Sequence, residues 1–480
     1  MLAARHETLW AAIVAAEAVW RETNGRLYPL AIAQKYALFD VLRDAAPYKA
    51  LLLGLTLACI AAFAGLVRAL ADGRTALLCA AFAAAGFALR AYHDANLAYN
   101  GMLQLVFLML VASLFAWRRA VLRRSAGAAL LAFALYVANG LTYEIAYLFF
   151  PLYACVVRPG RSWPRALAGT WPFALATLGL GLASAYLRSR VAFAPDSDYR
   201  AGTQALAYGA TFAKQAAAGI PLTYEFLDPQ RLFPSLQKIA LFDAGPYNFR
   251  IPAALAFAAA LFAALGRSAT AAPNDDERAR LGAAGMLGLG LAVLPVPLLA
   301  ASAKYQRELA WGLGYLPVFV QTFGVALLCA VAMRATRAPR ALVALVLFAI
   351  ADLTSGTNAI VGEAVSAETA SRGVVARAFA RGLARGVPAG ATIVLPSLPW
   401  VCEDPLCPDG LSPAYLLYGL TGRRYATVAP GDAYALPTAF RLGYASDPRA
   451  ATVTLERDGA APFRARYRET SSGAWSLALR

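Results

Sequence analysis

Long apolar segments recur along the first three quarters of the chain, separated by short polar stretches. All but the fourth are 16 to 23 residues long, and they cover residues 51–70, 75–90, 101–117, 126–157, 166–187, 251–266, 281–301, 311–333 and 341–356. A helix of about 20 apolar residues is long enough to cross the hydrocarbon core of a bilayer. The pattern therefore predicts an all-α polytopic membrane protein.

The fourth segment, 126–157, is too long for a single span and is interrupted at Asn139-Gly140. Clusters of Arg flank both of its ends, so both ends are expected on the same side of the membrane. We therefore expect a broken hairpin, in which two short helices go out and come back. With this hairpin the sequence predicts about ten transmembrane helices.

The distribution of Arg predicts the orientation. Fifteen Arg residues fall in the short loops on one side, whereas the short loops on the other side, 91–100 and 302–310, hold only Lys304 and Arg307 as cations. Short cytoplasmic loops carry the excess of Lys and Arg. This places three longer pieces outside the cytoplasm, residues 1–50, 188–250 and 357–480.

The overall composition agrees with a membrane protein. The chain is 60 % hydrophobic, only 15 % charged, and has a formal net charge of +16 and a mean hydropathy of +0.53. A soluble protein is about half apolar and about a quarter charged. Disorder, a coiled coil and an ordinary cytosolic enzyme are therefore excluded. Because the positive charge lies mostly in short loops, it indicates orientation in a lipid bilayer and no nucleic-acid partner.

Two of the segments predicted outside the cytoplasm, residues 1–50 and 188–250, have sequence features that differ from those of the spans. Residues 8–22 and 30–43 have apolar side chains at near-helical spacing, which predicts amphipathic helices on the membrane surface. Residues 1–25 contain no signal-peptide core. Either a first transmembrane helix is missing upstream of Met1, or the span 51–70 carries the N-terminal segment across. The 63-residue segment 188–250 is too long for a connector and is expected to be functional.

The tail, 357–480, is expected to be a small external α/β domain, with a helix at 362–385 followed by strands near ATIVLPS, ATVTLERD and FRARYRE. A domain of this size is typical of a docking or stabilising cap. Cys402 and Cys407 lie in a Pro-containing loop, and in an oxidising compartment we expect them to form a disulfide. With two His in the chain, a His-rich metal centre is excluded.

Ionisable side chains at membrane depth or at the outer mouth are candidates for function, because such groups are costly to keep there. Glu144 follows the break in 126–157, as a cavity-facing carboxylate or as a buried hydrogen-bonding anchor. His93 and Asp94 lie at the outer end of a span. Asp94 could act as a general base or bind a divalent cation, Mg²⁺ or Mn²⁺, or could simply cap the helix that begins near Gly101.

A second polar group lies at the start of the span 311–333, and includes Lys304, Gln306 and Arg307. The two cations could clamp a lipid phosphate. The alternative is that they only extend to the membrane interface. Glu17 and Glu22 are the N-terminal carboxylates expected to face an active cleft, although either could lie on a solvated helix face.

Three motifs together resemble a known family. GRLYPL ends the external amphipathic segment, a YE pair lies in the broken hairpin, and KYQREL precedes WGLGYLPVF at a late span. Over roughly residues 10–350 these resemble bacterial GT-C-type membrane glycosyltransferases, particularly the group around the O-antigen-modifying glucosyltransferases. The resemblance implies a polyprenyl-phosphate-linked sugar as donor, and an acidic residue in the first external loop as catalytic base or metal ligand. The usual Asp-Asp or Asp-Glu pair after a first helix is not visible in this sequence.

The hypothesis from the sequence is an inner-membrane transferase that moves a sugar to an envelope glycan or lipid acceptor on the outer face. Asp94, Glu17 or Glu22 would deprotonate the acceptor, and Lys304 and Arg307 would stabilise the leaving phosphate. A lipid-linked sugar flippase or transporter is the alternative, favoured by broken helices and disfavoured by the lack of an internal repeat. A non-catalytic protein of envelope-polysaccharide assembly is a third reading.

Overall fold

The computed structural model separates into two compact units, a helical unit from Leu9 to Val361 and a C-terminal unit from Gly362 onward. The structure describes residues 8–42, 45–90, 94–96, 99–157, 162–193, 205–223, 250–265, 274–394, 417, 420–428, 439–458 and 462–479.

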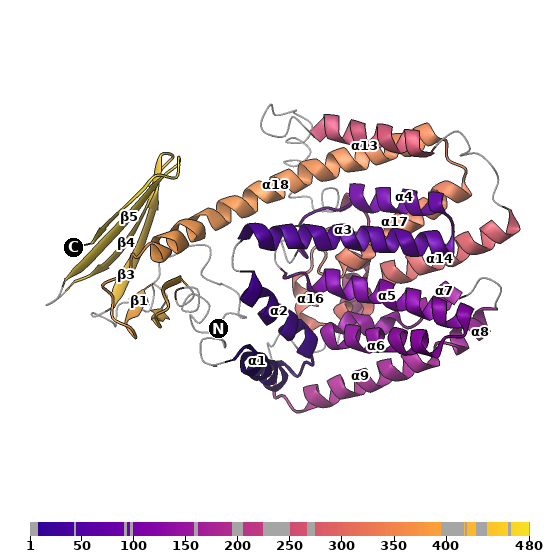
Figure 1. Ribbon diagram of the computed structural model, residues 1–480, viewed down its shortest axis with the longest axis horizontal. Coiled ribbons are helices and arrows are strands. Elements are labelled where there is room, and N and C mark those ends of the chain that lie inside the picture. Colours follow the sequence, from indigo (N-terminus) through magenta and orange to yellow (C-terminus); the bar gives the residue numbers. More distant parts are fainter. Residues whose placement is uncertain are drawn as a thin grey trace. The chain divides into compact units, whose positions relative to one another are not determined.

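The helical unit consists of helices of very different lengths (Figure 1). In chain order they are α1 (Leu9–Asn24), α2 (Pro29–Val41), α3 (Ala45–Leu70), α4 (Gly73–Ala85), α5 (Met102–Arg123), α6 (Ala126–Thr142), the 3-10 helix η2 (Glu144–Phe149), α7 (Leu152–Val157), α8 (Trp163–Ala168), α9 (Trp171–Ser189), α10 (Ala205–Ala218), α13 (Arg250–Leu265), α14 (Asp275–Val293), α15 (Val296–Ala300), α16 (Ala303–Glu308) and α17 (Val318–Ala335). The helix α18 (Arg340–Ala380) begins in this unit and ends in the C-terminal unit.

Five helical segments among the described residues are long and apolar enough to cross a membrane. They are Ala46–Leu70, Met102–Arg123, Asp275–Ala300, Val318–Ala335 and Arg340–Ala359. Three shorter apolar helices accompany them, Gly73–Ala85, Ala126–Thr142 and Ile251–Leu265. The prediction of a multi-pass, mainly helical membrane protein with a small C-terminal sheet is confirmed at this level.

The one predicted helix break, at Asn139-Gly140, is found close to its expected position, and a second break was not predicted. The segment 126–157 is interrupted after α6, where Tyr143 adopts an extended backbone and the chain continues as η2 and α7. The break therefore lies three residues beyond Gly140. A second interruption falls between α14 and α15 at Pro295, whose ring removes a backbone donor. Both amphipathic segments of the N-terminus form helices, α1 and α2.

The helical unit has two different ends (Figure 1). At one end lie α7 and α8, the α3–α4 and α5–α6 connections, the start of α14 and the turn between α17 and α18. We call this the Arg-rich end, because the described Arg residues of the short loops lie there, among them Arg74, Arg123, Arg334 and Arg340. Helices α1, α2 and α16 lie at the opposite end, which we call the outer end.

The core between the helices is aromatic and closely packed. The rings of Phe107 and Phe323 stack with centroids 4.1 Å apart, and Phe63 meets both edge-on, which joins α3, α5 and α17. Helices α14 and α17 approach at two glycines, where a Cβ on Gly324 would lie 2.6 Å from the Gly288 carbonyl oxygen. Small residues at such crossings let membrane helices pack backbone to backbone.

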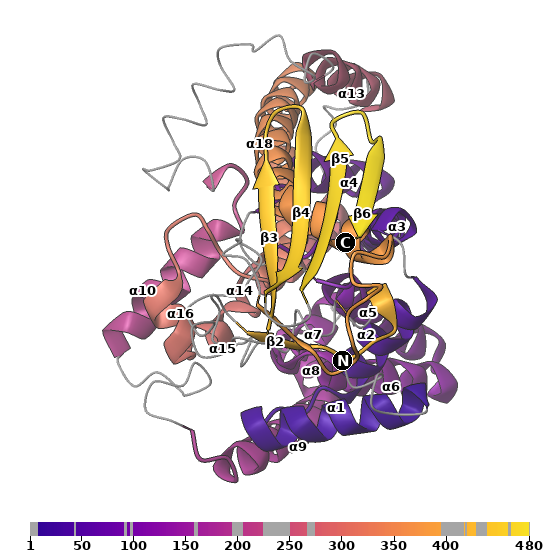
Figure 2. The same cartoon turned by 90° about the vertical axis from the view of Figure 1, so that its left-hand side faces the viewer.

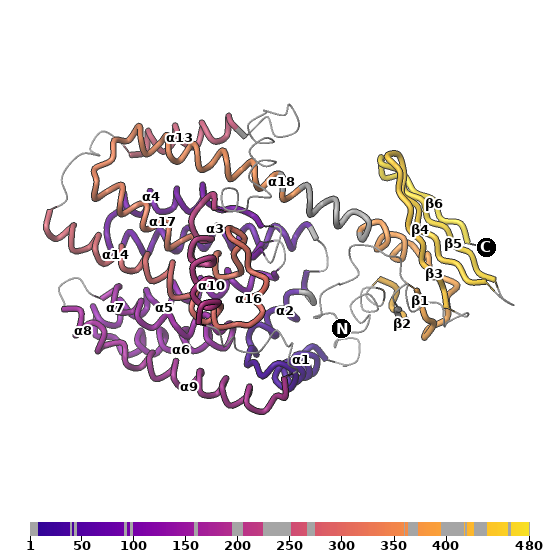
Figure 3. Tube along the Cα trace, turned by 180° about the vertical axis from the view of Figure 1, so that it is seen from behind, coloured from indigo at the N-terminus to yellow at the C-terminus, as the bar shows by residue number. Residues whose placement is uncertain are grey.

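Part of the segment 188–250 packs against the bundle. Helix α10 contacts α15 and α16, and Figure 3 shows α10 and α16 side by side from behind. Its Gln215 is fully buried. Gln215 donates to Gln321 Oε1 at 2.8 Å and accepts from the Tyr315 amide at 2.9 Å. Helix α10 is therefore packed into the outer end of the helical unit.

The C-terminal unit contains a six-stranded sheet of order β2-β1-β3-β4-β5-β6. Its strands are β1 (Thr392–Val394), β2 (Ala426–Val428), β3 (Phe440–Ser446), β4 (Ala450–Arg457), β5 (Phe463–Thr470) and β6 (Trp475–Leu479). Figure 2 shows the antiparallel strands β3 to β6. The strands predicted near ATIVLPS, ATVTLERD and FRARYRE are β1, β4 and β5. One face of the sheet shares a buried apolar cluster with the end of α18, through Val375 and Phe379, and with the turn after it, through Leu383.

An ion-pair cluster joins α18 to the sheet within the C-terminal unit. The Arg377 Nε donates to both Glu469 carboxylate oxygens, at 3.0 and 2.9 Å, and the Tyr467 hydroxyl donates to the same carboxylate at 2.7 Å. Burial acts to raise the pKa of Glu469, but these hydrogen bonds and the positive charges of Arg377 and Arg381 hold that pKa below its usual range. The ionised carboxylate is thus the form that the fold stabilises.

This cluster predicts an acid-sensitive C-terminal unit. Because the pKa of Glu469 is lowered in the folded state, its contribution is complete above the unfolded-state value of about 4.3 and is lost as pH falls through the lower, folded-state pKa. Glu469→Gln should destabilise the sheet by about 1 kcal/mol at neutral pH. Amide hydrogen exchange of β4 and β5 in the full chain measures this. Glu456→Gln is the control, because Glu456 lies on β4 on the face of the sheet opposite to that of Glu469. Equal protection in both variants would contradict the prediction.

Candidate functional site

A carboxylate shared by two guanidinium groups lies at the outer end of the helical unit. Arg188 Nη2 donates to both oxygens of Glu144, at 3.1 and 3.3 Å. Arg26 Nη2 lies 3.8 Å from the second oxygen of Glu144, beyond hydrogen-bonding distance but within ion-pair range. The Glu144 side chain is 15 % exposed, against 23 % for Arg26 and 36 % for Arg188. We call these three residues the Arg-Glu-Arg triad, and it has one more positive than negative charge.

Three distant segments of the chain position the triad. Arg26 belongs to the turn between α1 and α2, Glu144 is the first residue of η2, and Arg188 lies in the last turn of α9. The turn requires Gly25, whose φ is +59°. A Cβ at this position would lie 2.7 Å from the Arg188 Cα atom. Gly25 therefore allows the backbones carrying the two arginines to touch.

Gly25→Ala should therefore disturb the triad. The left-handed backbone and the close contact together should cost about 1–2 kcal/mol of stability. The measurement is the thermal unfolding midpoint in detergent micelles. Gly179→Ala on α9 is the control, because a Cβ at Gly179 meets nothing within 4 Å, and alanine is the better helix former. Equal midpoints for the two variants would contradict the assignment.

Tyrosine side chains surround the triad. Tyr28 and Tyr143 have ring centroids 5.9 Å apart, and the Tyr305 and Tyr315 rings are 4.3 Å apart. The Tyr99 and Tyr315 hydroxyls are hydrogen bonded at 3.1 Å. Arg26 is close enough for its charge to act on the hydroxyls of several of these residues. We call these five residues the tyrosine cluster, and together with the triad it forms the candidate site.

Burial favours the protonated form of three tyrosines of this cluster. Burial raises the pKa of Tyr28, Tyr305 and Tyr315 well above the ordinary value. A protonated phenol is a hydrogen-bond donor at every physiological pH. Protonated phenols beside two guanidinium groups favour an anionic ligand with several acceptor oxygens, such as a phosphate.

The segment KYQREL forms α16, and its polar residues point in different directions. Lys304 is buried, and its Nζ lies 3.9 Å from the Glu308 carboxylate, whereas Arg307 is exposed. The side chain of Gln306 donates to the Ala300 carbonyl at the end of α15, at 2.9 Å. Within this segment the structure places Tyr305 in the candidate site and gives Gln306 a role in ending α15.

Asp94 has the geometry of a turn cap next to a cavity. One of its oxygens accepts from the Arg90 amide at 3.1 Å and the other from the Asn96 amide at 2.7 Å. The residue is buried. A cavity of about 320 Å³, which includes solvent-open space, has Asp94, Asn96 and Tyr315 among its lining residues. Tyr315 thus connects this cavity with the tyrosine cluster.

The remaining sequence candidates fall in different places. Glu17 on α1 pairs with Arg21 at 3.3 Å, and its other oxygen is buried without a hydrogen-bond partner among the described residues. Glu22 on the same helix is exposed. His93 and the pair Cys402 and Cys407 lie outside the described residues.

Several residues of the site were not singled out in the sequence. Arg26 and Arg188 are 162 residues apart in the chain. In the sequence, GRLYPL marks only the end of an external amphipathic segment, and Arg188 stands at a helix end, where an Arg is common. Arg90 is a further example, because its guanidinium donates to the carbonyls of Gly312, Leu313 and Ala218 and so ties the end of α10 to the turn that precedes α17. The sequence signal that could have identified Arg90 is its position next to an otherwise apolar span.

The described part of the chain contains no group of three or more His, Cys, Asp or Glu side chains placed to hold a metal ion. Comparison with known proteins adds no assignment, because no protein-family model, no curated protein and no solved structure matches the chain. What the candidate site does must therefore be inferred from its own residues.

Proposed function

We propose that the protein is a membrane glycosyltransferase that moves a sugar from a polyprenyl-phosphate carrier to an envelope glycan or lipid acceptor. In this proposal it is a GT-C-like protein of the bacterial inner membrane with about ten spans. Its outer end, residues 188–250 and the C-terminal unit lie outside the cytoplasm. The observation that carries the proposal is the Arg-Glu-Arg triad with its excess positive charge, set among protonated tyrosines.

The triad supplies what a lipid-linked phosphate needs. Arg188 and Arg26 offer planar, permanently charged donors, which suit phosphate oxygens. Glu144 holds the Arg188 guanidinium in place through both of its oxygens. The three motifs that resemble the GT-C family, GRLYPL, the YE pair and KYQREL, contribute Arg26 and Tyr28, Glu144, and Tyr305 respectively. Their proximity in space is what a shared site requires.

The proposed reaction is a displacement at the anomeric carbon. The acceptor hydroxyl oxygen forms the new bond to that carbon, and the bond between the carbon and the carrier phosphate oxygen breaks. The hydroxyl proton passes to a carboxylate, for which Asp94 is the first candidate because it lines the cavity next to Tyr315. The phosphate leaves with its added negative charge stabilised by Arg26 and Arg188.

The direct test is turnover by the purified protein in liposomes that contain polyprenyl-phosphate sugars extracted from membranes. The proposal predicts that free polyprenyl phosphate appears when an acceptor extract is added. Movement of the intact sugar-lipid across the bilayer without release would instead favour a flippase. Neither release nor movement with any extract would favour a non-catalytic assembly protein.

The orientation makes a separate prediction. An alkaline phosphatase reporter fused after Arg480 should be active, because this enzyme folds only outside the cytoplasm, while one fused after Arg124, at the Arg-rich end, should be inactive. The physical reason is that Arg-rich short loops remain in the cytoplasm. The reverse pattern would overturn the orientation and with it the external location of the candidate site.

A further inference from the structure

A second basic site lies at the Arg-rich end, away from the triad. A pocket of about 280 Å³, which includes solvent-open space, is lined by the guanidinium-bearing residues Arg74, Arg334 and Arg340. Its other walls are apolar and consist of Leu78, Leu265, Met333, Ala338 and Val343. The pocket thus combines three cations with a hydrocarbon lining.

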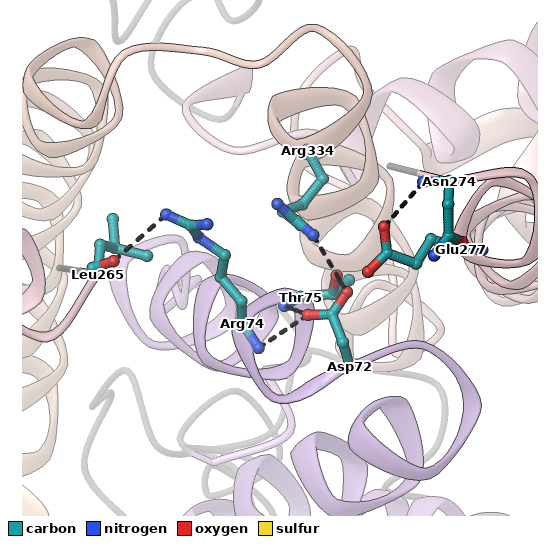
Figure 4. Close-up of polar contacts among 7 residues, drawn as sticks. All are labelled: Asp72, Arg74, Thr75, Leu265, Asn274, Glu277 and Arg334. Atoms are coloured by element: carbon teal, nitrogen blue, oxygen red, sulfur yellow. Dashed lines mark hydrogen bonds and ion pairs between the residues drawn. The ribbon is translucent and has the colours of Figure 1, made fainter. Parts of the chain in front are cut away.

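The three arginines lie at helix termini on the Arg-rich end of the helical unit. Arg74 is in the first turn of α4, Arg334 is in the last turn of α17, and Arg340 begins α18. Figure 4 shows Arg74 and Arg334 side by side, with Arg74 reaching the Leu265 carbonyl at 3.2 Å. The guanidiniums of Arg74 and Arg334 are close enough to repel each other. The pocket therefore lies where apolar spans give way to loops.

One carboxylate partly balances these charges. Asp72 caps α4, accepting from the Arg74 and Thr75 amides at 2.8 and 2.7 Å, and its other oxygen lies 3.5 Å from Arg334. Glu277, which Figure 4 also shows, is engaged in a capping box with Asn274. Three guanidinium groups against one carboxylate leave a net charge of +2.

Two details indicate that the pocket is incomplete without a ligand. The Arg334 side chain is only 12 % exposed, and its Nε is buried with no hydrogen-bond partner among the described residues. The Arg340 guanidinium stacks on the Phe262 ring at 4.3 Å, and forms no ion pair within the described part of the chain. A buried donor such as the Arg334 Nε is costly when it remains unsatisfied.

We propose that this pocket binds the phosphodiester headgroup of an anionic phospholipid from the membrane leaflet at the Arg-rich end. The guanidinium groups would hold the phosphate oxygens, while the apolar walls contact the first carbons of the acyl chains. Basic pockets between transmembrane helices are suited to such headgroups. This site is independent of the sugar-transfer proposal, since it lies at the other end of the helical unit.

The test compares lipid retention by the full-length protein in nanodiscs of phosphatidylcholine with and without phosphatidylglycerol or cardiolipin. Native mass spectrometry should show anionic lipid bound to the wild type. Arg334→Gln should retain about tenfold less, in line with the loss of one charge-assisted interaction. Arg340→Gln is the second variant, because it leaves the Asp72–Arg334 ion pair intact. It should show the same loss even if Arg334→Gln folds poorly.

Arg337→Gln is the matched control, because Arg337 is exposed in the same turn and does not line the pocket. It should retain anionic lipid as the wild type does. Equal losses in all three variants would indicate general surface attraction and overturn the site. Stabilisation of the wild type by inorganic phosphate alone, with no preference for anionic lipid, would overturn the lipid assignment.

Discussion

Replacing both Arg26 and Arg188 by Ala should lower the release of polyprenyl phosphate by about 100-fold or more. Each guanidinium makes a charge-assisted contact worth about 1.5–3 kcal/mol, and each 1.4 kcal/mol is a factor of ten in rate. The corresponding Lys variants should also be impaired, because an ammonium group cannot reproduce the planar fork of Arg. Turnover in liposomes, with the amount of folded protein measured in parallel, gives the result.

The same experiment has a control at the residue that follows α9. Arg190 lies two residues after Arg188, is exposed, and bonds the Tyr186 hydroxyl at 2.7 Å. Arg190→Ala removes a positive charge nearby and should leave turnover unchanged. A loss as large as that of the double variant would mean that only the general charge of this end matters. Full activity of the Arg26 and Arg188 double variant at normal abundance would remove the triad from the mechanism.

The second large effect concerns Asp94, which we expect to accept the acceptor proton. General-base catalysis contributes about 10²- to 10⁴-fold, so Asp94→Asn should reduce turnover by about that amount while donor binding persists. Asn keeps one acceptor oxygen but presents an NH₂ group to one of the two backbone amides that Asp94 now binds. Some loss of stability should therefore accompany the loss of turnover.

A variant of a second carboxylate helps to distinguish a loss of catalysis from a loss of stability. Glu17→Gln on α1 alters a carboxylate with one buried oxygen that has no hydrogen-bond partner among the described residues, so it tests a second of the three candidate bases. If Asp94 is the base, Glu17→Gln retains turnover. If Asp94→Asn keeps normal turnover and only unfolds more readily, Asp94 is a turn cap alone. Turnover measured per folded molecule distinguishes these results.

Much of the helical architecture was predictable because long apolar runs have few alternatives in a membrane. The segments 51–70 and 101–117 gave the helices α3 and α5, each about six residues longer than predicted at one end. The predicted span 341–356 and the predicted tail helix 362–385 instead form one continuous helix, α18. The hairpin break was displaced by three residues, because Gly140 remains helical where it packs against Tyr147, and the extended residue is Tyr143. Local composition marks a break, but tertiary contacts decide where it falls.

The candidate site was predictable only in part. Glu144 was recognisable as a carboxylate at membrane depth, but its partners come from the ends of other helices, and neither periodicity nor spacing links Arg26 to Arg188. The contact that joins them depends on the left-handed backbone of Gly25. Position in the sequence likewise suggested a phosphate clamp of Lys304 and Arg307, whereas one of these is buried and the other exposed on the six-residue α16.

The segment 188–250 illustrates the same limit. Its length suggested a functional external loop, and the structure shows that one of its helices, α10, packs into the outer end through Gln215 and Ala218. A buried Gln pair between α10 and α17 cannot be found by hydropathy, because each Gln alone suggests an exposed position. The interaction becomes visible only when both helices are placed.

The central claim is that the outer end of the helical unit holds the phosphate of a polyprenyl carrier. It is tested most directly with a photoactivatable polyprenyl phosphate, incubated with the purified protein and cross-linked, with the attachment sites mapped by mass spectrometry. Our account predicts cross-links in peptides that contain Tyr28, Tyr143 or Tyr305, and their loss in the Arg26 and Arg188 double variant. Cross-links confined to the pocket of Arg74 and Arg334, or unchanged in the double variant, would contradict it.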